Sequence, residues 1–154
     1  MKIINPKIAL HKIQRYCAYQ ERCHQEVRDK LYSFGLRKNE VENIIATLIQ
    51  DNFINEERFA ILYAGGKFRV KNWGKRKIEY ELKGRKISVY CIKKALNSID
   101  EQEYQDVIIK LIKKKNSVLK KDETFIKKHK VAQYVIHKGF ETELVWQLIE
   151  SNMK

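Results

Sequence analysis

The chain has 154 residues, of which 44% are hydrophobic, and this length allows one domain or a few small modules. No segment approaches the roughly eighteen consecutive apolar residues of a membrane-spanning helix, so a membrane is not an expected partner. The formal net charge of +13 favours an anionic partner, either nucleic acid or an acidic protein surface.

Three helices are predicted in the first third of the chain. A proline suits the first turn of a helix over residues 6–19, because its missing N–H is tolerated there. A second helix is expected over 23–34 and ends at Gly35 in a left-handed conformation. Asn39 and Glu42 have the spacing of an N-cap and its N3 partner. They introduce a third helix with the apolar stripe Val41, Ile44, Ile45, Leu48 and Ile49.

The middle third repeats this order. Asn55 is expected to cap a helix. The inner face of that helix comprises Phe59, Leu62 and Tyr63. The pair Gly65-Gly66 is expected to loosen or end it. A second helix opens after Gly74, and Ser88 is a candidate cap for a third.

The last third contains three more predicted helices. Asp100 leads into a helix with apolar periodicity, and the lysine-rich stretch 113–121 is expected to form a longer connection. A helix that opens just ahead of Val131 follows, and Thr142 is placed to cap the final one. A single proline and six glycines leave long helices largely uninterrupted.

A pattern of apolar positions occurs three times along the chain. Apolar residues lie four, nine, fourteen, seventeen and eighteen positions after each of Val27, Ile78 and Val131. The pattern predicts an all-α protein made of three three-helix modules, at residues 1–54, 55–99 and 100–154. Repeated small helical units usually provide a binding surface and rarely concentrate chemistry in one pocket.

Basic residues concentrate in two segments. Residues 67–94 carry eleven Lys or Arg against two Glu, and residues 110–130 carry nine Lys against one Asp and one Glu. In both segments, cations are expected in the first turn of a helix, where the dipole attracts phosphate or carboxylate groups. The candidates for contact with a partner or DNA are Lys67, Arg69, Lys71, Trp73, Lys75, Arg76, Lys77, Lys127, Lys128 and Lys130.

Two interpretations of these segments stay open. Phe68 and Trp73 are candidates for stacking on a base or anchoring a protein contact. Alternatively, Trp73 packs at a junction between modules and the cations form a solvated face.

No catalytic or cofactor constellation stands out in the sequence. The glycine pair before Lys67 lacks the upstream glycine and the following Ser or Thr of a phosphate-binding loop. Cys17, Cys23 and His24 lack a second pair at metal-ligand spacing, and we expect the three cysteines to be free thiols in a cytoplasmic protein. We therefore expect no metal and no cofactor. An enzyme is a third interpretation that depends only on four histidines, which we expect at the surface: His11, His24, His129 and His137.

Three segments carry a family resemblance. Residues 55–60 read Asn-Glu-Glu-Arg-Phe-Ala, an acidic segment ending in Phe-Ala. Residues 73–82 contain the pattern Gly-x-x-x-Ile-x-x-Glu-Leu, and residues 21–31 are similar to the helix of the first repeat in a known family. With these segments, essentially the whole chain resembles the RecX regulatory proteins, which modulate the RecA recombinase.

The resemblance implies an elongated, curved, non-enzymatic protein. It implies binding in the groove of the RecA–DNA filament, with inhibition of ATP hydrolysis, strand exchange and co-protease activity. The basic segments would face acidic RecA surface or DNA backbone, with single- or double-stranded DNA as an assisting partner of a monomeric protein. The alternative function is a stand-alone DNA-binding protein that uses a basic helical face.

Overall fold

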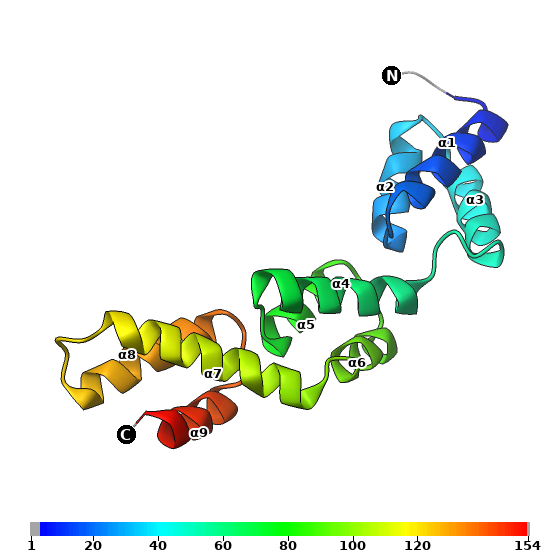
Figure 1. Cartoon of the computed structure of the whole chain (residues 1–154). Helices are drawn as coiled ribbons and strands as arrows, with labels where there is room; N and C mark the ends of the chain where they lie inside the picture. Colours follow the sequence, from blue (N-terminus) through cyan, green and yellow to red (C-terminus); the bar gives the residue numbers. More distant parts are fainter. Residues whose placement is uncertain (1–3, 154) are drawn as a thin grey trace.

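Nine α-helices and no strands form the regular structure of residues 4–153, the part of the chain that the computed structural model describes. Figure 1 shows three successive groups of three helices along an elongated, curved path, with α1–α3 at one end and α8 reaching the other. The predicted all-α fold of tandem three-helix units is confirmed. The helices are α1 (Pro6–Tyr19), α2 (His24–Ser33), α3 (Lys38–Gln50), α4 (Glu56–Lys71), α5 (Lys75–Gly84), α6 (Val89–Asn97), α7 (Glu101–Val118), α8 (Thr124–His137) and α9 (Thr142–Asn152).

Side-chain caps fix the starts of three helices, and two of these caps, Asn55 and Ser88, were predicted. The side chains of Asn55, Ser88 and Asp100 accept hydrogen bonds from backbone N–H groups three residues later, at 2.9, 3.2 and 2.9 Å. Each cap satisfies a donor that the first helical turn leaves unpaired. Gly35 follows α2 with φ of 85°, the left-handed conformation expected of it.

The predicted caps of α3 and α9 are wrong by one or two residues. The backbone N–H of Arg37 donates to the Glu40 carboxylate at 2.9 Å, so α3 begins before Asn39. Glu42 is instead held by the Arg28 guanidinium at 3.0 and 3.2 Å. Thr142 is the first residue of α9 and not its cap.

The helix α4 continues through Gly65 and Gly66, which were predicted to loosen or end it. Ala60, Ala64 and Gly65 lie on its buried face, and α4 packs along α6. Burial of this face, including the packing of α4 along α6, compensates for the low helix propensity of glycine. The helix ends only at Asn72, which has a φ of 56°.

The connection between α7 and α8 is shorter than predicted. The helix α7 extends to Val118, so most of the stretch 113–121 is helical and only residues 119–123 connect the two helices. The lysine-rich end of α7 stays helical because Leu111 and Ile112 keep one face of the helix buried against α8 and α9.

The repeat positions form the interior of the protein. Seventeen of the eighteen are buried, and Leu96 is partly buried. Two residues predicted on inner faces outside the repeat are exposed, Ile49 at 47% and Leu62 at 52%. Each lies one position beyond the width of its helix's buried stripe, so the periodicity alone placed them too close to the core.

The interior consists of two hydrophobic cores. The helices α1–α3 enclose one, and α4–α9 share the other, which also includes Cys23 at the start of α2. Two ion pairs cross between these parts, Arg58–Glu21 at 2.8 Å and Arg85–Glu26 at 3.4 Å. Because all four side chains are partly solvent-exposed, each pair stabilises this junction by about 1 kcal/mol or less.

Candidate partner-binding surface

The first turn of α5 carries three cations, as predicted. Lys75, Arg76 and Lys77 are its first three residues, Gly74 is the N-cap, and the turn contains no acidic residue. The dipole is positive here, so this arrangement favours an anionic partner. Arg76 is exposed and has no ion pair among residues 4–153, which makes it the most accessible cation of the turn.

Lys75 is engaged inside the protein. Its Nζ lies 3.6 Å from Glu101 Oε2 and 4.7 Å from the centre of the Tyr104 ring. The side chain is only 21% exposed. Its charge is therefore partly compensated, and it is a weaker candidate for contact with a partner than Arg76.

The two aromatic candidates have different environments. Phe68 is 2% exposed, and its ring centre lies 5.6 Å from that of Tyr104. The prediction that Phe68 stacks on a base is therefore wrong, because the core covers its ring. Trp73 is partly buried and packs against the α4–α9 core. The ammonium groups of Lys67 and Lys77 lie 5.0 and 4.6 Å from the Trp73 ring centre. These distances are those of cation–π contacts.

Arg69 and Lys71 are exposed in the last turn of α4. The Arg69 guanidinium covers Gly65, where an added Cβ would lie 2.6 Å from Nη2. Cations near the carboxyl end of a helix interact favourably with its dipole. Helix stability therefore accounts for these two residues without any partner.

The second group of predicted cations lies further along its helix than expected. Since α8 begins at Thr124, Lys127, Lys128 and Lys130 follow the first three residues of the helix and do not open it. The Nζ of Lys128 lies 3.2 Å from Glu150, and that of Lys130 lies 2.9 Å from Asp122. Glu150 belongs to α9 and Asp122 to the connection between α7 and α8. These two carboxylates offset part of the positive charge of the predicted segment.

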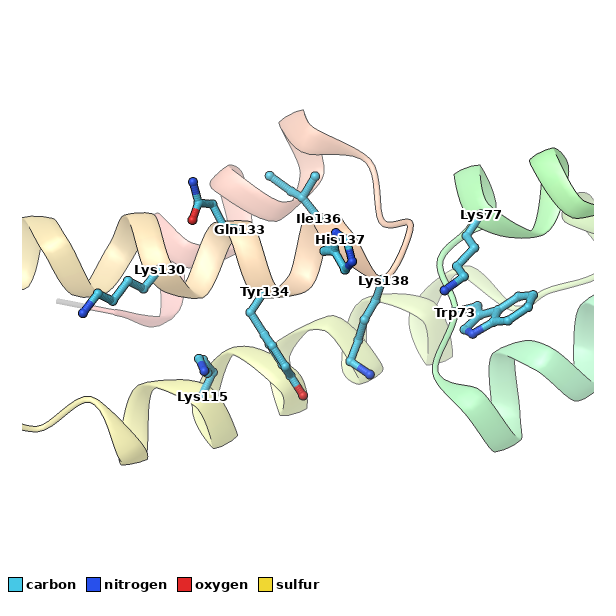
Figure 2. A pocket seen from close by; sticks show the side chains of 9 residues that line it. All are labelled: Trp73, Lys77, Lys115, Lys130, Gln133, Tyr134, Ile136, His137 and Lys138. Atoms are coloured by element: carbon cyan, nitrogen blue, oxygen red, sulfur yellow. The ribbon is translucent and has the colours of Figure 1, made fainter.

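A groove between α4–α5 and α7–α8 gathers cations and aromatic rings from distant parts of the chain (Figure 2). Its volume is about 870 Å³, and no acidic residue lines it. The ammonium groups of Lys115 and Lys138 lie 5.1 and 5.4 Å from the Tyr134 ring centre. We call it the basic–aromatic groove and define it by Trp73, Lys77, Lys115, Lys130, Tyr134 and Lys138.

Three of the six residues that define this groove were not predicted from the sequence. Tyr134, Lys138 and Lys115 were not among the candidates, although the four-residue spacing of Tyr134 and Lys138 on one helix is a signal for an aromatic–cation pair. Nothing in the sequence places Tyr134 and Trp73 in one groove, because this depends on how the end of α8 packs beside the start of α5.

Backbone hydrogen bonds hold the two walls of the groove together. The N–H of Gly74 donates to the Lys138 carbonyl and the N–H of Arg76 to the Gly139 carbonyl, both at 2.9 Å. An added Cβ on Gly74 would lie 2.3 Å from the Gly139 carbonyl carbon, so only glycine allows this approach. We call this contact between the α4–α5 and α8–α9 turns the glycine latch.

Tyr104 lies beneath the glycine latch. Its ring is fully buried, and its hydroxyl donates to the Glu141 carboxylate while accepting from the Lys75 backbone N–H at 2.9 Å. Burial, reinforced by the Glu141 carboxylate, raises the pKa of Tyr104 well above its usual value, so the phenol stays protonated. The hydroxyl thus ties the starts of α5 and α9 to α7.

The histidines and cysteines form no cluster that indicates chemistry. Within the described range, no three His, Cys, Asp or Glu side chains gather in a way that could hold a metal ion. The cysteines are free and buried, and burial raises the pKa of Cys17 to about 11. His24 is an exception to the predicted surface position, since it is half-buried, burial lowers its pKa, and its Nε2 has no hydrogen-bond partner.

Sequence profiles of known families match most of the region that forms this surface. Residues 55–96 match a family described as "RecX, second three-helix domain", and residues 101–149 match "RecX, third three-helix domain". Together the two matches span more than half of the chain. This protein belongs to the RecX family.

Several relatives are named "Regulatory protein RecX". The chain is 33% identical over 129 residues to the one from Clostridium tetani, covering 82% of this chain and 57% of that protein. It is 31% identical over 131 residues to that from Clostridium beijerinckii (84% and 61%) and 31% over 121 residues to that from Clostridium perfringens (76% and 55%). The chain therefore spans somewhat more than half the length of these curated relatives.

Solved RecX structures share the fold. The crystal structure of RecX from Lactobacillus salivarius superposes with a TM-score of 0.89 at 23% sequence identity, covering 95% of both chains. Another, titled "Crystal structure of regulatory protein RecX", gives 0.84 at 22% identity and covers 95% of this chain and 71% of that one. Among the helices of residues 4–153, none has the length and apolar character required to cross a lipid bilayer.

Proposed function

We propose that this protein binds RecA–DNA filaments and inhibits their ATP hydrolysis, strand exchange and co-protease activity. Membership in a family of regulatory proteins supports a role in regulation. The observation that carries the proposal is an extended helical protein on which uncompensated cations gather at the start of α5 and in the adjacent groove. Such a surface suits a long anionic polymer better than a small substrate.

The proposed mode of action is binding without catalysis. We propose that residues 1–54, 55–99 and 100–154 act as three modules of a cytoplasmic monomer, each meeting a successive part of a helical filament. Bound across neighbouring subunits, a stiff array of helices would oppose the conformational changes that accompany ATP hydrolysis, since a ligand favours the state it binds better.

A purified preparation tests this function directly. RecA-dependent ATP hydrolysis and strand exchange are measured while this protein is added up to a stoichiometric ratio. Both activities are expected to fall as the protein is added. Unchanged activities at stoichiometric protein would contradict the proposal.

A second candidate function is a stand-alone DNA-binding protein. The uncompensated cations of the first turn of α5 and the groove favour this alternative equally. It predicts tight binding to DNA without RecA, with affinity falling steeply as salt rises because bound cations are released from the phosphates. Comparing the affinity for bare DNA with that for the filament in one buffer separates the two functions.

Charge reversal at the start of α5 is expected to weaken inhibition. In Arg76→Glu with Lys77→Glu, the concentration for half-inhibition of RecA ATP hydrolysis should rise by about tenfold, equivalent to about 1.4 kcal/mol. The helix itself should not lose stability, since carboxylates are favoured in a first turn. Circular dichroism checks the helical content, and the ATPase titration measures the effect.

A matched control changes the same amount of charge on α1, away from the start of α5. Lys7 and Lys12 are exposed on α1, so Lys7→Glu with Lys12→Glu should leave inhibition close to that of the unmodified protein. Equal inhibition by both double variants would show that the start of α5 takes no part in binding.

A further inference from the structure

Three of the four lysines that define the basic–aromatic groove have no ion pair within residues 4–153. Lys130 is paired with Asp122, but Lys77, Lys115 and Lys138 have no carboxylate within 4.0 Å in the described part of the chain. Three cations therefore converge on a space of about 870 Å³ without an acidic neighbour in its lining. This volume lies within the roughly 300–1,000 Å³ of typical ligand sites, and the charge requires an anionic ligand.

The aromatic residues narrow the class of ligand. In Figure 2, Tyr134 projects from α8 toward α7 with Lys138 nearby, and Trp73 lies at the α4–α5 connection with Lys77 nearby. Each ring has ammonium groups within 4.6–5.4 Å of its centre. A flat base can take a place on the ring while the displaced ammonium group moves to a neighbouring phosphate.

This alternation of ring and cation matches unpaired nucleotides better than other anions. A duplex keeps its bases stacked on each other, so its phosphates could use the lysines but its bases could not use the rings. An acidic peptide would likewise need the cations and leave two partly exposed aromatic platforms unused. Single-stranded nucleic acid uses both features with little dependence on base sequence.

The groove is also formed before any ligand arrives. The glycine latch joins its walls through two backbone hydrogen bonds of 2.9 Å, and Tyr104 fixes the start of α5 from below. A preformed site loses little conformational freedom on binding. We propose that the basic–aromatic groove binds single-stranded nucleic acid, with bases stacked on Trp73 and Tyr134 and phosphates held by Lys77, Lys115 and Lys138.

This inference rests on the proposed function, because a RecA–DNA filament would bring the groove close to nucleic acid. Its test uses the whole chain without RecA. The protein contains two tryptophans, and Trp146 lies against His129 outside the groove, so Trp146→Phe leaves Trp73 as the single tryptophan. An oligothymidylate of about 15 nucleotides is titrated at low salt, and both tryptophan emission and the anisotropy of a labelled strand are recorded.

The expected result has two parts. The oligonucleotide should quench Trp73 emission with the same midpoint as the anisotropy change, because a stacked base contacts the indole ring. In the same background, Lys115→Glu with Lys138→Glu should weaken binding at least tenfold, whereas Lys7→Glu with Lys12→Glu should weaken it by less than threefold. Since the four substituted side chains lie outside the buried cores, circular dichroism should show unchanged folding.

Three results would overturn the proposal. One is binding by anisotropy without quenching of Trp73. Another is an equal loss of affinity in the two double variants, and the third is equal or tighter binding of a blunt duplex or a polyglutamate peptide at the same charge. Because RecA is absent from this titration, a negative result contradicts the groove as a nucleic-acid site but not inhibition of the filament. Conversely, unchanged RecA activity would contradict the inhibition but not quenching of Trp73 by the oligonucleotide.

Discussion

Replacing Gly139 by alanine is expected to destabilise the protein by about 3 kcal/mol, within a range of about 2–6 kcal/mol. Gly139 has a φ of +103°, which strains any residue with a side chain. An added Cβ would also lie 2.3 Å from the Cβ of Lys77 and 2.7 Å from its backbone nitrogen. Relief of that clash requires the α8–α9 turn to move away from α5, which breaks the glycine latch.

Urea unfolding followed by tryptophan fluorescence measures this effect, since both tryptophans pack against the α4–α9 core. Gly66→Ala is the matched control. A Cβ on Gly66 would meet no atom within 4 Å, so alanine inside α4 should stabilise the protein by about 0.5–1 kcal/mol. If Gly139→Ala were as stable as the unmodified protein, the close approach between the α8–α9 turn and α5 would be contradicted.

Truncation of Leu31 or Leu82 to alanine is expected to destabilise the core that contains it by about 2–5 kcal/mol. The two residues occupy the same position of the repeat, and both are fully buried. Leu31 lies in the α1–α3 core and Leu82 in the α4–α9 core. Each truncation leaves a cavity whose lining loses its packing contacts, because the surrounding helices relax only partly.

The two variants should differ in which signal changes. Neither tryptophan contacts the α1–α3 core, so fluorescence follows α4–α9 alone and circular dichroism follows all helices. Leu31→Ala should shift part of the circular-dichroism transition to lower urea and leave the fluorescence midpoint nearly unchanged. Leu82→Ala should shift the fluorescence midpoint. Coincident shifts of both signals in Leu31→Ala would show that the junction couples the cores more strongly than its two ion pairs imply.

Much of the fold could be predicted from local signals. Asn55 and Ser88 were recognisable as caps because the interaction that makes each a cap spans only three residues. The buried positions were recognisable because helical spacing repeats three times. The continuation of α4 through Gly65 was not, because propensity predicts a break and tertiary packing against α6 overrides it.

The candidate surface was predictable only in part. The first turn of α5 was visible in the sequence, since Arg76 and Lys77 are adjacent to their helix start. The neutralisation of Lys128 by Glu150 was not, because these residues are 22 positions apart and meet only through the packing of α9 on α8. The meeting of Trp73 and Tyr134 in one groove depends in the same way on contacts between distant helices.

We expect the basic side of this extended helical protein to bind the recombinase filament. Titration of the protein onto preassembled RecA–DNA filaments, with bare DNA in parallel, measures this binding by sedimentation and its effect by ATP hydrolysis in the same samples. We expect saturable co-sedimentation with the filament, a parallel fall in ATP hydrolysis and weaker retention on bare DNA. Equal retention on bare DNA with unchanged ATP hydrolysis would contradict this expectation.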